Sequence, residues 1–204
     1  MNHLLLLLLL NTASAVRPPA DYRVVLGEDL AQRAAALNAA GRHREAVRLV
    51  ERFQDAVEVL PPLAYEAGYA LNRLGEINDA LVHYNAAIER APNLASARYD
   101  RGEIYLAQSR WREAQADFEV VVRVRPGHWA GHFRMAHLAG VAGDPNELEK
   151  HLTQAIRTGF DLRAVVDDPS WRAWAKDPAL GAILRKIIIL YTDESLLRDM
   201  GLTP

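Results

Sequence analysis

The 204-residue chain contains no cysteine. This absence excludes a disulfide framework, a thiol nucleophile, a thiolate metal site and a lipid-modified N-terminal cysteine. The folded part of the chain must therefore be held together by the packing of its side chains, without covalent cross-links.

A large excess of charge of one sign is also missing. The chain has 24 Lys and Arg against 26 Asp and Glu, which gives a formal net charge of −2. Such a balance supplies no electrostatic reason to bind nucleic acid or an anionic membrane surface. We therefore expect neither of them as a partner.

The sequence lacks the short patterns that mark many catalytic sites, namely G-x-S-x-G, S-x-x-K, H-E-x-x-H and a glycine-rich phosphate loop. His128, His132 and His137 fall in one short stretch, but their spacing does not place all three on one helix face. Asp167 and Asp168 are neighbours whose side chains point apart, which suits a turn and a helix cap. The sequence therefore predicts no enzyme, no cofactor and no metal site.

No hydrophobic run is long enough to span a bilayer, which takes about 20 apolar residues. The leucine run Leu4–Leu10 is followed by Ala13-Ser14-Ala15, an A-x-A cleavage site. This order is typical of a secretory signal peptide, residues 1–15, whose removal leaves a mature chain that begins at Val16 and has no membrane span. We expect an exported protein, periplasmic or secreted. An uncleaved anchor or a misassigned start is the alternative, because no Lys or Arg precedes the leucine run.

What the sequence does contain is an internal repeat with a period of 34 residues. Small, aromatic and proline residues return at that spacing. The pairs are Gly68 and Gly102, Ala80 and Ala114, Tyr84 and Phe118, and Pro92 and Pro126. Fainter copies precede and follow this central part.

The period divides the chain into four copies, residues 27–60, 61–94, 95–128 and 129–162. Each copy reads as two helices joined by a turn, and the turns contain Gly41, Gly75, Ser109 and Gly143. An alanine early in most of the second helices lets the paired helices approach closely, and Tyr84 and Phe118 are predicted to fill the core. Residues 16–26, which include Pro18-Pro19, are predicted to form an extended lead-in.

Residues 163–204 break the period and are predicted to form a helical cap. Asp168 and Asp177 are each followed by a proline, which suits an N-cap followed by a first helical residue without an N–H. Trp171 and Trp174 are predicted to lie in the core of this cap. The apolar end of a repeat array needs a closing element of this kind.

A period of ~34 residues with these small, aromatic and proline positions resembles the tetratricopeptide repeat family. The stretch Gly159-Phe160-Asp161-Leu162 and the two later Asp-Pro pairs resemble a terminator that follows bacterial arrays of this repeat. The resemblance implies an all-α fold: a right-handed helical-hairpin solenoid of three to four repeats with a C-terminal helical cap. It also implies that the first helix of each repeat lines a concave face that binds partners.

Residues on that face recur at the repeat period and form the predicted binding groove. Its aromatic side chains would give one apolar contact per repeat, and its polar side chains would bind peptide groups. The predicted groove residues are Asn38, Tyr65, Tyr69, Asn72, Tyr99, Glu103, Phe133 and His137. The alternative is that the aromatic side chains fold onto adjacent helices and only cover the core.

We therefore expect a protein–protein interaction scaffold or adaptor of the bacterial envelope, which holds an extended peptide or a partner helix. One alternative is an accessory subunit or regulator of an envelope enzyme or assembly machine. Another is a structural protein that associates with itself through its apolar last helix and Leu196, Leu197 and Met200.

Overall fold

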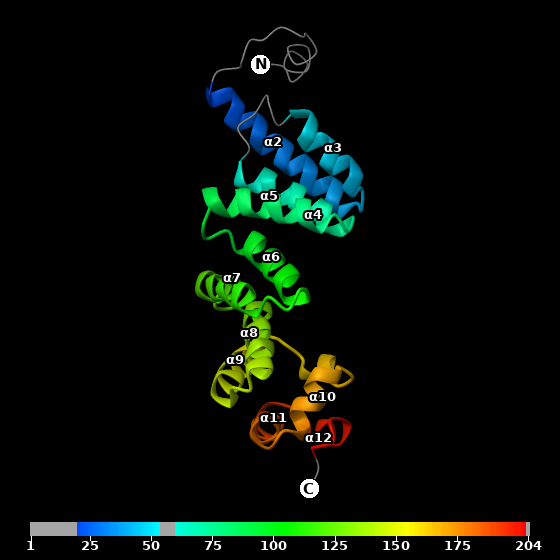
Figure 1. The fold of residues 1–204 in the computed structure, drawn as a ribbon, viewed down its shortest axis with the longest axis vertical. Coiled ribbons are helices and arrows are strands. Elements are labelled where there is room, and N and C mark those ends of the chain that lie inside the picture. Colours follow the sequence, from blue (N-terminus) through cyan, green and yellow to red (C-terminus); the bar gives the residue numbers. More distant parts are fainter. Residues whose placement is uncertain (1–19, 54–59, 203–204) are drawn as a thin grey trace. The chain divides into compact units, whose positions relative to one another are not determined.

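The computed structural model describes residues 20–53 and 60–202. Every regular element in these two ranges is helical, which confirms the predicted all-α class. The predicted signal peptide, residues 1–15, lies outside them. The chain divides into two compact units, residues 1–83 and 84–204, and the division falls inside one helix. Figure 1 labels the helices of each unit.

The first unit begins with a helical hairpin, α2 (Ala20–Ala39) and α3 (His43–Phe53). α4 (Pro61–Arg73) follows, and then α5 (Ile77–Arg90), which continues into the second unit. Apolar side chains of α2, α3 and α4 meet in one buried cluster that is rich in alanine, so a larger residue there would overpack the helices. The cluster consists of Leu26, Leu30, Ala31, Ala34, Ala46, Val50, Leu63, Ala67 and Ala70.

The second unit contains two complete hairpins. α6 (Ala95–Ala107) pairs with α7 (Trp111–Val124), and α8 (Trp129–Ala142) pairs with α9 (Pro145–Arg157). Ala114 and Phe118 are fully buried, as predicted. A Cβ added at Gly102 would stand 2.8 Å from the Phe118 ring, so the absence of a side chain there is what lets α6 and α7 approach.

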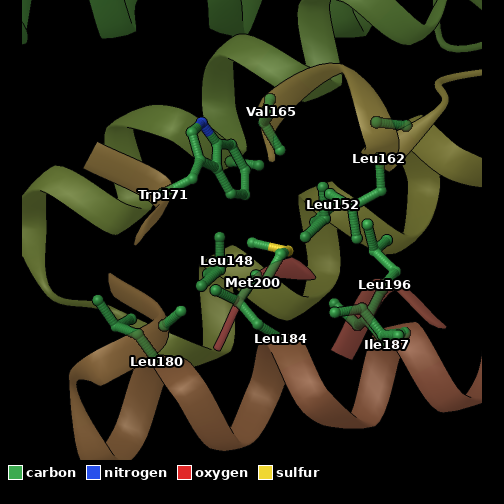
Figure 2. Close-up of a cluster of buried hydrophobic side chains, with 14 of the residues drawn as sticks. Leu148, Leu152, Leu162, Val165, Trp171, Leu180, Leu184, Ile187, Leu196 and Met200 are labelled. Carbon is green, nitrogen blue, oxygen red and sulfur yellow. The ribbon is translucent and has the colours of Figure 1, made fainter. Parts of the chain in front are cut away.

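After α9 the chain forms a short 3₁₀ helix, η1 (Leu162–Val165), and three further helices. These are α10 (Pro169–Lys176), α11 (Pro178–Tyr191) and α12 (Ser195–Asp199). Figure 2 shows side chains of α11 directed into the same apolar space as those of α9. The labelled members of this core are Leu148, Leu152, Leu162, Val165, Trp171, Leu180, Leu184, Ile187, Leu196 and Met200.

This core corrects the predicted route to self-association. Leu196 is fully buried and Met200 nearly so, because α12 folds back onto α9 and α11. A short amphipathic segment at the end of an array buries its apolar side chains locally when a neighbouring apolar face is available. These two side chains therefore cannot meet a second copy.

The extended lead-in predicted for residues 16–26 is partly wrong, because α2 begins at Ala20. A proline pair ends a preceding helix but leaves the residues after it free to start a new one. α2 therefore contains 20 residues, against 13 in α4 and in α6.

The helical hairpins turn through a left-handed residue at the same position of the repeat. The φ angle is +71° at Gly41, +81° at Gly75, +58° at Ser109 and +69° at Gly143. The N–H of this residue donates to the carbonyl three residues earlier, and the next N–H donates to the carbonyl five residues earlier. This is the Schellman arrangement, which ends the first helix and satisfies its last carbonyls.

Aspartate side chains begin three of the later helices, two of them at the predicted Asp-Pro pairs. One carboxylate oxygen of Asp168 accepts from the N–H groups of Ser170 and Trp171. Asp177 caps α11 and Asp144 caps α9 in the same way. Each cap satisfies two N–H groups that have no partner inside the helix.

Ser109 provides a direct test of the turn. A side chain in the left-handed region is unfavourable, so we expect Ser109→Gly to raise the free energy of unfolding by roughly 0.5–1 kcal/mol. Gln108 precedes it with an ordinary φ of −88°, so Gln108→Gly should lower stability by a similar amount. Urea unfolding followed by circular dichroism measures both. Destabilisation by Ser109→Gly would contradict the turn geometry.

Candidate partner-binding surface

Asn38, predicted to lie in the groove, is engaged inside the first unit. It is only 6% exposed. Its amide nitrogen donates to the Glu66 main-chain oxygen at 2.9 Å and to the Glu66 carboxylate at 2.8 Å, so it ties α2 to α4. Burial raises the pKa of Glu66, although this hydrogen bond acts in the opposite direction. Asn38 is therefore a link between helices, and its amide is not presented to a partner.

The predicted aromatic residues of α4 are half-buried and lie close together. The ring centroids of Tyr65 and Tyr69 are 6.3 Å apart, and the His43 ring meets Tyr69 edge-on at 6.1 Å. Asn72, one turn further along α4, is also half-buried. The first unit thus presents a small, partly exposed aromatic surface on α4.

Tyr99 occupies the equivalent position on α6 in the second unit. Its ring meets the buried Phe118 ring edge-on at 5.6 Å, and its side chain remains partly exposed. Burial raises the pKa of the Tyr99 hydroxyl, the Glu103 carboxylate raises it further, and Arg134 lowers it. Tyr99 therefore stands beside a carboxylate and a guanidinium.

Glu103 forms an ion pair with Arg134 that links α6 to α8. One terminal nitrogen of Arg134 donates to Oε2 of Glu103. The two side chains are 29% and 25% exposed. Burial raises the pKa of Glu103, and Arg134 partly opposes this shift.

Sequence reasoning missed Arg134. The residue one repeat period after Glu103 is His137. Arg134 comes three residues earlier, so it lies about one helical turn before His137 on the same helix. A search for opposite charges on successive first helices, offset by one turn from the period, would have found it.

Phe133, predicted as a groove residue, is half-buried and packs against the C-terminal part of the chain. Its ring stacks on Phe160 at 4.3 Å and on Trp171 at 5.7 Å. His137, the other predicted groove residue of α8, meets Trp174 edge-on at 5.2 Å. Both predicted groove residues are therefore partly covered by the chain's own aromatic side chains, and both stay partly exposed.

The cover comes mainly from α10. Trp174 lies so close to α8 that a Cβ added at Gly140 would stand 2.7 Å from its ring. Trp171, fully buried, fills the space beside it, as its predicted place in the cap core requires. The physical reason is that the apolar face of the fourth copy must be closed, and α10 closes it from the first-helix side.

Four buried side-chain atoms around this junction of α6, α8 and α10 have no hydrogen-bond partner. They are Oε1 of Glu103, Nε of Arg134, Nδ1 of His137 and Nε1 of Trp171. Buried polar atoms of this kind are uncommon in folded proteins and costly, so their concentration at one place marks it as unusual.

The sequence profile of the TPR repeat family matches residues 68–109, from α4 to the turn after α6. The chain contains tetratricopeptide repeats. This agrees with the resemblance predicted from the 34-residue period, and it gives the α4 and α6 surfaces the position of first helices in such repeats.

Two relatives carry the name tetratricopeptide repeat and J domain-containing co-chaperone DNJ1. The protein from Fusarium oxysporum f. sp. lycopersici is 40% identical over 70 residues, which are 34% of this chain and 13% of the relative. The protein from Cryptococcus neoformans var. grubii is 31% identical over 106 residues, 50% of this chain and 20% of the relative. The chain thus spans a fifth or less of the length of these relatives.

Among solved structures, the chain is similar to MamA, residue 41 to the end, from Desulfovibrio magneticus RS-1. The TM-score is 0.52 at 24% sequence identity, and the match covers 88% of this chain and 94% of that one. At this identity the likeness shows the fold alone.

The structure does not bring the three clustered histidines of the repeats together. His128 stacks on Trp129, His137 meets Trp174, and Nδ1 of His132 lies 3.1 Å from Nδ1 of His151. Within residues 20–53 and 60–202, no group of three or more ligating side chains could hold a metal ion. No helix in the same ranges is both long and apolar enough to cross a membrane.

His151 predicts a pH dependence of stability. Burial, with Lys150 and His132, lowers its pKa to about 4, and the facing Glu147 carboxylate only partly opposes this. The pKa of His151 in the unfolded chain is higher than in the folded chain. At a pH between these two pKa values, the unfolded chain binds a proton at His151 and the folded chain does not. The free energy of unfolding of the second unit should therefore fall by roughly 2–3 kcal/mol as pH drops from 7 to 4.

Substitution separates His151 from the other titrating groups. The pH slope should flatten in His151→Gln, while His128→Gln, a change at an exposed histidine, should keep the wild-type slope. Urea unfolding at intervals between pH 4 and pH 7 provides the slopes. Equal slopes in His151→Gln and wild type would show that His151 does not titrate as described.

Proposed function

We propose that the chain is a non-enzymatic scaffold or adaptor that binds a protein partner through the exposed first-helix surfaces of its repeats. In this proposal residues 27–162 form the four repeats and residues 163–204 close their C-terminal end. The observation that carries it is the partly exposed group Tyr99, Glu103 and Arg134 on α6 and α8. The other side chains of the predicted face in this unit, Phe133 and His137, are also partly exposed, and they pack against Trp171 and Trp174.

Three further features support a protein partner. Tyrosine and arginine are enriched among the residues that dominate protein interfaces. The chain contains tetratricopeptide repeats, and both fungal relatives are named as co-chaperones. The partly exposed Tyr65 and Tyr69 give the first unit a surface of similar composition.

We also propose that the scaffold acts in the bacterial envelope. The support is the leucine run and the Ala13-Ser14-Ala15 site of the sequence. The intact mass of the protein purified from its native cells tests this: a chain that begins at Val16 in the envelope fraction supports export. A cytosolic chain that retains Met1 would refute it.

Self-association is a second candidate, favoured by the exposed end of α11. Ile189 is 53% exposed and Leu190 60% exposed, which is unusual for adjacent large apolar side chains. Light scattering coupled to size-exclusion chromatography measures the molar mass in solution. A wild-type dimer that becomes a monomer in Leu190→Lys would support self-association through α11. A monomeric wild-type protein would refute it.

Tyr99→Ala tests the proposed surface. Because Tyr99 is only partly buried, its truncation should cost about 1–2 kcal/mol of stability, less than the ~3–5 kcal/mol expected of a fully buried aromatic. Partner binding should weaken at least tenfold, because a few aromatic anchors carry most interface energy. The partner is first identified by crosslinking and pull-down from native cells, and its Kd is then measured with purified proteins.

Two control variants define the outcome. Trp111→Ala removes an exposed aromatic from α7, a second helix, and should leave the Kd unchanged. Tyr105→Ala removes a buried aromatic from α6 itself and should show the larger loss of stability. If Tyr99→Ala binds the partner as tightly as wild type, the proposed surface is wrong.

A further inference from the structure

An open hollow lies on the first helical hairpin, between α2 and α3. Its volume is about 370 Å³, which is within the range of protein pockets that hold ligand groups. Ala36 and Leu37 of α2 and Leu49 of α3 give it an apolar floor. Arg33 and Arg42 complete the lining, and no carboxylate among the described residues belongs to it. This α2–α3 hollow therefore combines apolar surface with two positive charges.

Both arginines of the hollow are accessible to a partner. Arg33 pairs with Asp29 one helical turn away, and Arg42 pairs with Glu45, yet the two arginine side chains are 50% and 56% exposed. Exposed pairs of this kind contribute little to stability, so their exchange for another carboxylate costs little. A guanidinium also carries five N–H donors, so each arginine can hold a second carboxylate beside its own.

The opposite composition occurs at the end of α11. Ile189 is 53% exposed and Leu190 is 60% exposed. Two carboxylates follow within four residues, at Asp193 and Glu194, and both side chains are exposed. The ion pair that Asp193 forms with Arg163 is long, at 3.5 Å, and both of its side chains are more than half exposed. Residues 189–194 thus present apolar side chains next to two accessible negative charges.

We propose that residues 189–194 of one copy of the chain dock into the α2–α3 hollow of a second copy. Ile189 and Leu190 would cover the apolar floor, and Asp193 and Glu194 would meet the two arginines. The proposal rests on the second candidate function, self-association, and names the surface that receives α11. Its basis is that the two surfaces match in both respects, apolar against apolar and negative against positive.

The contact joins two different surfaces, so it differs in kind from a symmetric dimer. Each copy carries one hollow and one α11 end, and a copy bound through its hollow still has a free α11 end. Contacts of this head-to-tail type continue from copy to copy and produce rings or open chains. A symmetric contact between two α11 ends would instead stop at a dimer and would leave the hollow empty.

The test is sedimentation velocity of the purified protein between roughly 1 µM and 1 mM, the range in which weak interfaces become populated. The mean mass of wild type should rise with concentration beyond that of a dimer. Ala36→Glu places a carboxylate in the hollow, opposite Asp193 and Glu194, and should weaken association at least tenfold. Ala39→Glu, the same change at an exposed alanine of α2 outside the lining, should associate like wild type.

Mixing two defective variants gives the sharpest result. Ala36→Glu retains an intact α11 end, and Leu190→Lys retains an intact hollow. Each should be monomeric alone, and an equal mixture should form a one-to-one heterodimer that grows no further. A symmetric α11 contact predicts otherwise: Ala36→Glu would dimerise by itself, and the mixture would contain no heterodimer.

The outcomes separate the hollow from self-association in general. If Ala36→Glu associates like wild type while Leu190→Lys does not, the hollow is refuted and self-association through α11 remains. If wild type stays monomeric throughout, both are refuted. Tyr99→Ala should associate like wild type, so neither result bears on the partner surface beside Tyr99.

A second pair of variants covers a folding defect in Ala36→Glu, which circular dichroism would reveal. Arg42→Glu reverses one charge at the rim of the hollow and should also weaken association at least tenfold. Arg48→Glu, the same change at an exposed arginine of α3 outside the lining, is its control. Equal association of these two variants would overturn the proposal.

Discussion

The left-handed residue between the two helices of each hairpin is the constraint on which the rest of the structure depends. It fixes where the first helix ends and in which direction the second begins, and so it decides which face of the first helix remains outside the hairpin. Gly41, Gly75 and Gly143 adopt this conformation at little cost. Ser109 adopts it with a side chain, which shows that the turn is imposed by the packing of α6 on α7 and not only by local preference.

The second determining feature is how the chain closes its own end. α11 covers α9, while α10 places Trp171 and Trp174 against the first-helix side of α8. Phe133 and His137 pack against these tryptophans and, like Tyr99, Glu103 and Arg134, stay partly exposed. The two tryptophans therefore close the end of the array and border the predicted face of the second unit.

Much of this fold follows from the sequence. The 34-residue period predicts the hairpins, the Asp-Pro pairs predict the starts of α10 and α11, and the alanine and aromatic positions predict the core around Phe118. These features are local or strictly periodic, so no tertiary information is needed to find them. The start of α2 at Ala20 was missed because its first turns carry no helical apolar pattern.

The candidate site was harder to predict, because its residues are defined by contacts between helices. Asn38 shares a periodic position with Asn72 but is buried against Glu66. Arg134 lies outside the periodic positions and becomes visible only when α6 and α8 are placed side by side. Periodicity identifies the face of a helix, whereas the neighbouring helix decides which side chains on that face stay accessible.

The central claim is that a partner contacts the α6 and α8 surface beside Tyr99. Photo-crosslinking in native cells tests it most directly, with p-benzoylphenylalanine placed at position 99, at Trp111 on α7, or at Val124 near the end of α7. The structure predicts a crosslinked partner of one mass from position 99 and little or none from the two exposed α7 positions. Equal crosslinking from position 111, or none from position 99, would contradict it.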